Sequence, residues 1–300
     1  MNENRPAAPL FGRVALLGMG LIGSSLARVM RARPSLAGEI VANARTDVTL
    51  ARVRELGIAD RTENDPAAAV AGADLVILCA PVGTFQDLAA TIAPHLAPGA
   101  IVSDVGSTKR SVIRDVGPHI PAGVHLVPAH PLAGTEYSGP DAGFAELFDG
   151  RWTILTPPSG TDDGAVARVR AFWEGCGAMV ETMDADHHDR VLAIVSHLPH
   201  LIAFTICGTA DDLADESRGQ VLKFAASGFR DFTRIAASDP VMWRDVFLNN
   251  KDALLEMLAR FTEDAQAMAR AVRWGDAEYI EDKVKRGRAI RRSLIELNQA

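Results

Sequence analysis

The chain has 300 residues, with 31 Lys and Arg against 38 Asp and Glu, which gives a formal charge of −7. One hydrophobic core stops growing at about 250 to 300 residues, so this length predicts two domains. Hydrophobic residues at 48% and charged residues at 23% are typical of a globular protein and exclude a disordered one. The negative charge supplies no basic field for a phosphate backbone, which argues against a nucleic acid partner.

Cysteine usage and the N-terminus indicate the compartment. The three cysteines, Cys79, Cys176 and Cys207, are far apart and have no CxxC spacing. Neither a disulfide framework nor a thiolate zinc site is indicated, and we expect a cytoplasmic protein. Residues 1–10 contain no apolar run resembling a signal peptide and are expected to form a loose tail. No stretch approaches the roughly 20 apolar residues of a membrane span, so we expect no membrane partner.

In chain order, short apolar runs alternate with amphipathic stretches up to Asp184, which is typical of β-α-β units and a parallel sheet. The expected strands are Val14–Leu17, Ile40–Ala42, Leu75–Ala80, Ile101–Asp104, Val124–Val127, Trp152–Leu155 and Met179–Glu181. Helical periodicity then predicts Ala185–Cys207, Gln220–Ala225, Met242–Met268 and Asp276–Leu297. We therefore expect an α/β domain over residues 1–184 and an all-helical domain over residues 185–300.

A glycine motif directly follows the first expected strand. Gly18, Gly20 and Gly23 have the GxGxxG spacing, with Leu21 and Ile22 between them, and the expected helix opens at Ser24. Such a turn lets the backbone approach a pyrophosphate and presents a helix N-terminus to its charge. A turn that binds nothing is the alternative, but strand before and helix after favour a dinucleotide site.

The end of the second expected strand bears on cofactor choice. The acid that binds the adenosine ribose is expected about 20 residues after the last glycine, where this chain has Asn43 instead. Arg45 and Thr46 can instead hold a 2′-phosphate, which predicts NADP or use of both cofactors. Because the acid Asp47 comes next in the chain, NAD stays an alternative cofactor. Arg45 can equally be a solvated loop residue.

Three further segments follow expected strands and should reach the same edge of the sheet, where open α/β sheets bind ligands. They are Ala80-Pro81, the segment Asp104–Lys109 with Ser107, and the loop His130–Gly139. Ser107 also suits the N-cap of a helix. A histidine at the position of His130 can take a proton from a hydroxyl at neutral pH, although a lone loop histidine is more often without such a role.

The helical half carries polar groups in apolar surroundings. His197 and His200 lie three residues apart, on one helix face, with Pro199 kinking the chain between them. The segments Gly228–Arg234 and Asp239–Asp245 combine arginines with aromatic residues. Such arginines can bind carboxylates, and by spacing alone interhelical ion pairing is the stronger alternative.

Metal binding is a weaker interpretation of the same region. The possible ligands are His187, His188, Asp189, His197 and His200. No HExxH or similar frame accompanies them, so we expect no metal.

Together these motifs resemble the prephenate/arogenate dehydrogenase family of tyrosine biosynthesis. The specific part of the resemblance is the ordered set HPLAGTE, SHLPH and FTRIA, and it covers the chain from about Val14 to at least Asn250. It implies an N-terminal Rossmann-like dinucleotide-binding domain, a C-terminal helical dimerisation domain with a homodimer, and an active site between the two domains. Two departures are the absence of an acid at Ala44 and a chain that ends at Ala300 without room for an appended regulatory or mutase domain.

The resemblance also implies roles for individual residues. The matching positions are His130, Ser107, His200, Arg234, His197 and Asp231. His130 resembles the catalytic histidine that contacts the ring hydroxyl, and Ser107 its hydrogen-bonding neighbour near nicotinamide and substrate. His200 and Arg234 resemble residues that position substrate, Arg234 facing a carboxylate. His197 and Asp231 resemble supports of that site.

The implied reaction uses a dicarboxylate with a ring hydroxyl. Hydride passes to nicotinamide, the hydroxyl proton passes to His130, and loss of carbon dioxide makes the ring aromatic. A 3-hydroxyacid dehydrogenase is the alternative enzyme, but neither Lys223 nor Lys251 has the asparagine four residues on that a KxxxN pair requires. A regulator that senses NAD(P) without turnover is the alternative outside enzymes.

Overall fold

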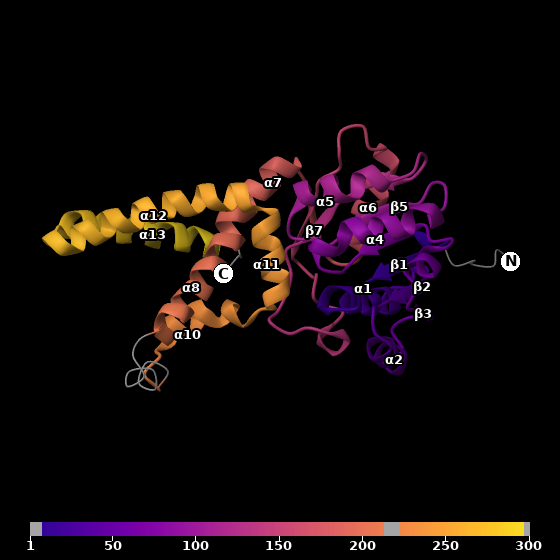
Figure 1. Ribbon diagram of the computed structural model, residues 1–300, viewed down its shortest axis with the longest axis horizontal. Coiled ribbons are helices and arrows are strands. Elements are labelled where there is room, and N and C mark those ends of the chain that lie inside the picture. The colour runs from indigo at the N-terminus through magenta and orange to yellow at the C-terminus, as the bar shows by residue number, and fades with distance from the viewer. Residues whose placement is uncertain (1–7, 213–222, 297–300) are drawn as a thin grey trace. The chain divides into compact units, whose positions relative to one another are not determined.

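The structure is a computed structural model that describes residues 8–212 and 223–296 (Figure 1). The chain forms two compact units, residues 1–251 and residues 252–300. Most of the expected N-terminal tail, and part of the expected helix Gln220–Ala225, lie outside the described residues.

A six-stranded parallel sheet forms the centre of the first unit, with the order β3-β2-β1-β4-β5-β6. Its strands are β1 (Phe11–Leu17), β2 (Ala37–Asn43), β3 (Arg61–Glu63), β4 (Leu75–Leu78), β5 (Ile101–Asp104) and β6 (His125–Leu126). This is the strand order of a Rossmann fold, and it reverses between β1 and β4. The expected parallel α/β fold is confirmed, with β3 as a strand that periodicity did not predict because only three residues of it pair.

Both faces of this sheet are buried, which explains its uninterrupted apolar strands. In β1, Val14 and Leu16 belong to one hydrophobic cluster, whereas Ala15 and Leu17 belong to the other. The alternation follows from the pleat of a strand, which turns successive side chains to opposite faces. Helices α1 (Leu21–Ala32) and α6 (Asp163–Gly175) supply the first cluster, and α4 (Phe85–Ile92) and α5 (Lys109–Val116) contribute to the second.

The strands after β6 form a second, three-stranded sheet, a feature that the sequence analysis did not anticipate. It contains β7 (Ala129–Pro131), β8 (Trp152–Leu155) and β9 (Met179–Thr182), with β7 antiparallel to β8. His130 therefore lies in a strand, paired with Ile154, and the expectation that it lies in a loop is wrong. A three-residue strand containing proline carries no alternation by which it could be recognised.

Shorter helices complete the α/β part: α2 (Asp47–Glu55), α3 (Pro66–Val70) and several single 3₁₀ turns. After Asp184 the described residues contain helices and no strand. These are α7 (Ala185–Leu192), α8 (Leu198–Asp212), α10 (Ser227–Thr233) and α11 (Pro240–Asn249) in the first unit, and α12 (Lys251–Trp274) and α13 (Ala277–Glu296), which make up the second. The single expected helix Met242–Met268 is divided near Asn250, and α10 was not expected.

Residues Ala193–His197 form a π-helical segment between α7 and α8. Pro199, the second residue after this segment, has no N–H to donate into the helix. The wider turn keeps the helix continuous across this irregularity, as π-bulges do, often at functional sites.

By length and composition, the continuous helical stretch Ala185–Asp212 is apolar enough to cross a membrane, with a mean hydropathy of 1.8 in its most apolar window. This corrects the expectation that no stretch approaches a membrane span. The stretch also carries fully buried His188, Asp189 and His197, which hydrogen bond within the first unit. Those contacts are typical of a core helix in a globular protein.

Candidate active site

The three glycines of the fingerprint have three different packing environments. Gly18 has φ of +117°, and a Cβ there would lie 2.7 Å from the backbone nitrogen of Ala80, at the end of β4. A Cβ on Gly23 would lie 2.0 Å from the Gly18 carbonyl oxygen, whereas Gly20 faces open space. The first and third glycines therefore allow the turn and the close packing of α1. The second leaves room at the helix N-terminus for a pyrophosphate. Leu21 and Ile22 begin α1 behind this turn and are half-buried.

The residues after β2 lie beside this turn, since the Gly18 N–H donates to the Asn43 carbonyl oxygen over 3.0 Å. Asn43 is buried, and its side-chain amide donates to the Glu63 carbonyl oxygen over 2.9 Å. Arg45 is exposed, and no described contact engages its guanidinium. The Thr46 hydroxyl caps α2 by accepting the Thr49 N–H over 3.2 Å. Of these three residues, Arg45 is the one whose polar group has no described partner.

The loop after β7 packs against the same end of α1. The Phe144 N–H donates to the Ser25 hydroxyl over 3.1 Å, and Arg52 of α2 forms an ion pair with Asp141 at 2.7 Å. A Cβ on Gly143 would lie 2.3 Å from the Ser24 hydroxyl, so this approach needs glycine. The loop that follows β7 is therefore tied to the helix that would carry the cofactor.

The ends of β4 and β5 meet at this edge, as expected for neighbouring parallel strands. Ala80 is half-buried and Pro81 exposed. The N-cap of α5 is Thr108 and not Ser107, because the helix begins at Lys109, one residue later than a Ser107 cap would require. Ser107 is half-buried, and no described hydrogen bond engages its hydroxyl, which leaves that group available to a ligand.

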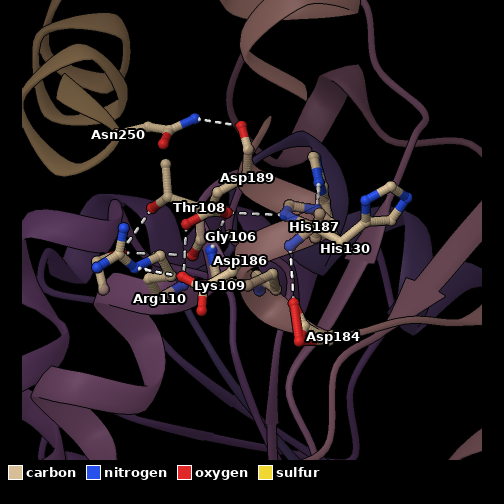
Figure 2. Close-up of polar contacts among 12 residues, drawn as sticks. Gly106, Thr108, Lys109, Arg110, His130, Asp184, Asp186, His187, Asp189 and Asn250 are labelled. Atoms are coloured by element: carbon tan, nitrogen blue, oxygen red, sulfur yellow. Dashed lines mark hydrogen bonds and ion pairs between the residues drawn. The ribbon is translucent and has the colours of Figure 1, made fainter. Parts of the chain in front are cut away.

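The N-terminus of α5 is capped from another helix (Figure 2). Asp189 of α7 accepts the Lys109 N–H at Oδ1 over 2.8 Å and the Arg110 N–H at Oδ2 over 3.0 Å. Although burial opposes the shift, hydrogen bonds from His188 and from these backbone groups lower the pKa of Asp189. The carboxylate therefore stays charged at the positive end of α5.

His130 is 7% exposed and its Nδ1 lies 2.9 Å from Nε2 of His188. Burial, with the nearby His188, Lys109 and His197, holds its pKa well below the ordinary 6.5. Its Nε2 has no described hydrogen-bond partner, and it is not among the described side-chain atoms that are fully buried without a partner. His130 is therefore an uncharged imidazole with one nitrogen engaged and the other available to a ligand.

A buried ion pair lies directly beneath His130. The Lys109 ammonium contacts the Asp104 carboxylate and donates to the Ala129 carbonyl oxygen over 2.6 Å. Asp104 also accepts the N–H groups of Gly106 over 2.7 Å and Ala129 over 3.1 Å. Burial lowers the pKa of Lys109, and the Asp104 carboxylate opposes that shift. The pair joins the end of β5 to β7 and so fixes the strand that carries His130.

His197 is fully buried, and its Nδ1 accepts a hydrogen bond from the Asn250 side-chain amide over 3.0 Å. The same amide donates to the Asp189 carbonyl oxygen over 2.8 Å. The Ser107 backbone favours the protonated ring, but Nε2 has no well-formed hydrogen bond in the described structure. Burial dominates and lowers the pKa of His197 to about 4. These contacts suit a support of the site rather than a group that reacts.

His200 and Arg234 form a second polar group. The His200 ring stacks on Trp243 with centroids 3.7 Å apart, and its Nδ1 donates to the Ser196 carbonyl oxygen over 2.9 Å. Burial lowers the pKa of His200, and Arg234 contributes to that shift. The Arg234 side chain is 62% exposed, and its guanidinium lies 3.5 Å from the Glu136 carboxylate. His200 thus has one ring nitrogen without a described partner, and Arg234 has an exposed side chain with a long ion pair.

Asp231 is exposed at the middle of α10, and among the described contacts none engages its carboxylate. The part of the chain that the structure describes also holds no cluster of His, Cys, Asp or Glu with the geometry of a metal site.

Sequence reasoning missed several residues of this region. His188 and Asp189 entered only as possible metal ligands, and Lys109, Glu136 and Asn250 were given no role of their own. The available signal was two adjacent polar residues on the helix face that also carries buried Leu192. Polar groups on a buried face must find partners, and these find His130 and the start of α5.

Two family models match the chain: the prephenate dehydrogenase nucleotide-binding domain over residues 26–182, and the prephenate dehydrogenase dimerization domain over residues 184–286. A cyclohexadienyl dehydrogenase of Zymomonas mobilis is 40% identical over 286 residues, 95% of this chain and 97% of that protein. A prephenate dehydrogenase of Bacillus subtilis is 32% identical over 269 residues, 88% of this chain and 71% of that protein.

Solved structures agree. The prephenate dehydrogenase of Aquifex aeolicus in complex with hydroxyphenyl propionate and NAD+ superposes with a TM-score of 0.87 at 32% identity, over 94% of this chain and 98% of that one. The arogenate dehydrogenase of Synechocystis gives a TM-score of 0.78 at 25% identity, over 94% and 99%. With a Rossmann sheet, a glycine fingerprint and a buried histidine at the carboxyl edge, the chain belongs to the prephenate dehydrogenase family of oxidoreductases.

Proposed function

We propose that the protein catalyses the NAD(P)-dependent oxidative decarboxylation of prephenate, arogenate or both, giving 4-hydroxyphenylpyruvate or tyrosine in tyrosine biosynthesis. The observation that carries this proposal is the buried, uncharged His130 in a chain of this family, followed by a loop that packs on α1, the helix of the glycine fingerprint. Such a site joins a proton acceptor to a place for a hydride acceptor.

The proposed cofactor site is the turn from Gly18 to Gly23 with the ends of β2 and β4. Gly20 leaves the backbone open to a pyrophosphate, and the N-terminus of α1 favours its charge. The proposed contacts to the adenosine ribose are Asn43, Arg45 and Thr46. The proposed contacts nearer the nicotinamide are Ala80, Pro81 and Ser107. When bound, NAD(P)+ supplies the acceptor for the hydride of the substrate ring.

His130 is the proposed proton acceptor. Its pKa is low because of burial, so the ring is uncharged at neutral pH and can accept the hydroxyl proton at Nε2. Ser107 is the proposed hydrogen-bonding neighbour, since its hydroxyl is free of described partners. Loss of the hydroxyl proton assists departure of the ring carboxylate as carbon dioxide, and the aromatic product makes the step effectively irreversible.

Arg234 and His200 are the proposed substrate-positioning residues. An exposed guanidinium can bind a carboxylate with charge-assisted hydrogen bonds, in exchange for its long contact with Glu136. Trp243 stacks on the His200 ring, and because Nδ1 of that ring donates its proton to the Ser196 carbonyl oxygen, the free Nε2 can accept a hydrogen bond from substrate. His197 is the proposed support of this arrangement through Asn250, and Asp231 of α10 is the proposed support of Arg234, which follows three residues later in the chain.

For the cofactor, the finer proposal is that NADP is used at least as well as NAD. No acid at the end of β2 repels a 2′-phosphate, and the exposed Arg45 offers a positive charge there. Thr46 is committed to capping α2, so it contributes less to this choice than Arg45.

We also propose that the division between the cofactor-binding half and the helical half lies near Asp184, and that the helical half forms a homodimer. The family model over residues 184–286 describes a dimerization domain. Exposed Ile194, Val195 and Ile206 on the helical stretch after Asp184 supply apolar surface for such a contact. A cytoplasmic location stays a prediction from the cysteine pattern.

One assay tests the function. Purified protein is mixed with prephenate or arogenate and with NAD+ or NADP+, and the absorbance of the reduced cofactor is followed. Turnover with either substrate supports the proposal. Binding of cofactor without turnover would instead favour a nucleotide-sensing regulator, and turnover only with simple 3-hydroxyacids would favour the alternative dehydrogenase.

A further inference from the structure

Three side chains form a continuous line of hydrogen bonds inside the first unit. His130 Nδ1 lies 2.9 Å from His188 Nε2, and His188 Nδ1 lies 2.8 Å from Asp189 Oδ1. His188 and Asp189 are 0% and 1% exposed, so no water competes for these bonds. The line leads from a short strand, β7, to the helix α7.

The line has a direction, because one end of it can only accept. The Asp189 carboxylate already accepts two backbone N–H groups at the start of α5 and stays ionised (Figure 2). His188 Nδ1 must therefore donate to it, which leaves His188 Nε2 without a proton. The His130 Nδ1 must then donate to His188, which leaves His130 Nε2 as a lone pair.

The geometry points to His188 and Asp189 as positioning residues that fix the tautomer of His130, so that its Nε2 is the nitrogen that accepts the substrate proton. This inference rests on the proposed function. The opposite tautomer would place a proton on Nε2, where it could only donate, and would leave two lone pairs facing each other between the two rings.

The same line of hydrogen bonds can also move the positive charge that His130 acquires when it accepts a proton. His130 is buried near Lys109, so a positive charge that appears on it is unfavourable. Once Nε2 has accepted the hydroxyl proton, the Nδ1 proton of His130 can move to His188 Nε2. No atom is gained or lost in this shift, and the positive charge then lies on His188, next to the Asp189 carboxylate. A carboxylate in that place stabilises an imidazolium, as in a Ser-His-Asp triad.

The first arm of the experiment measures the tautomer of His130 in the wild-type protein. Protein labelled with ¹⁵N in its histidine rings is studied at neutral pH, without substrate, by long-range proton–nitrogen correlation. The His130 signals are identified by their loss in His130→Asn. We expect His130 and His188 both to carry their proton on Nδ1. A proton on Nε2 of His130 would overturn the inference.

The second arm uses two replacements of His188. In His188→Gln the amide oxygen can still accept from His130 Nδ1, whereas in His188→Leu nothing can. We expect His188→Leu to lower kcat by about 10- to 100-fold, as when the orienting partner of a histidine is lost, with KM changed far less. His188→Gln should recover part of that loss. His187→Gln is the matched control, since this neighbouring ring is exposed.

The outcomes separate the inference from a merely structural role and from the function itself. Equal kcat values for His188→Gln and His188→Leu, or a lowered melting temperature with unchanged kcat, would leave His188 as packing only. A wild-type protein inactive on prephenate and arogenate would remove the proposed function. The His130 tautomer is measured without turnover. It would still decide whether the line of hydrogen bonds from Asp189 to His130 has the direction that we infer.

Discussion

His130 combines burial with an open ring nitrogen, and its replacement should affect the chemical step. We predict that His130→Asn lowers turnover by roughly 10²- to 10⁴-fold, the contribution of a lost general base, and changes substrate affinity far less. Steady-state kinetics with His187→Gln as a control would measure this. Near-normal turnover in His130→Asn would remove the base from the proposed function.

Arg234 is mostly exposed, and among residues 8–212 and 223–296 its one ion pair is the long contact with Glu136, so its charge is available to a ligand. We predict that Arg234→Gln weakens substrate binding by about 1.5 to 3 kcal/mol, the contribution of a charge-assisted hydrogen bond. The Michaelis constant is the measurement. If it stayed the same while only the melting temperature fell, Arg234 would be an interhelical structural residue.

The end of β2 is the place to change cofactor choice. We predict that Ala44→Asp combined with Arg45→Ala shifts the preference toward NAD, because an acid there accepts hydrogen bonds from the ribose and repels a 2′-phosphate. The ratio of kcat/KM for the two cofactors would be compared between the wild-type protein and the double variant. A wild-type enzyme strongly selective for NAD would show that Arg45 faces solvent.

How far single residues can be predicted depends on whether their roles are local. The roles of Gly18 and Gly23 follow from spacing, since a tight turn between strand and helix always needs them. The partner of His130 does not follow from spacing, because His188 is 58 positions away and meets it only through folding. Ser107 was assigned a helix cap that belongs to Thr108, since boundaries shift by a residue without changing the pattern.

Helix α7 and the π-helical segment that follows it bury two histidines, His188 and His197. For His197 the pKa is about 4, well under the ordinary value near 6.5, because of burial. Between these values the unfolded chain binds the extra proton, so stability is complete above about pH 6.5 and falls as the pH drops toward 4. The whole shift corresponds to about 3 kcal/mol. Groups near the ring, Asp189, His188, His200 and the Ser107 backbone, modify it.

We therefore predict that acid destabilises the protein over this range, and that His197→Gln reduces the pH dependence of the unfolding free energy. Urea unfolding at several pH values would measure it. His187→Gln should retain the wild-type dependence, because that ring is exposed. If the pH dependence of the unfolding free energy were unchanged in His197→Gln, the folded protein would bind a proton at His197 as readily as the unfolded chain does.

Among the elements, the buried strands are predictable and the irregular ones are not. Apolar runs predict Ile101–Asp104 and Trp152–Leu155 with the observed bounds. No hydrophobic pattern marks the π-helical segment or the break near Asn250. The buried Asn250 side chain is satisfied by the Asp189 carbonyl oxygen, which is distant in the sequence. The second sheet was missed because β7 has only three residues.

For the whole molecule, assembly is the property that a single chain leaves open. The second unit exposes Leu255, Phe261 and Val272 along α12, and the helical part of the first unit exposes Ile194 and Val195. We predict a homodimer, because closed two-fold pairs are the commonest soluble assemblies and the family model names a dimerization domain. Light scattering at micromolar concentration measures this, and a mass of 32.0 kDa would contradict it.

The cap that Asp189 places on α5 affects the order in which the enzyme becomes competent. During synthesis the sheet, the glycine turn and His130 emerge before α7, and domains fold as they appear. Until residue 189 has left the ribosome, α5 lacks the carboxylate that accepts its first N–H groups. The His130 ring of β7 also lacks its hydrogen-bond partner His188. A chain ending before α7 would therefore lack both the carboxylate at the start of α5 and the ring that hydrogen bonds to His130, so the proposed proton acceptor is completed only after the sheet and the glycine turn have been synthesised.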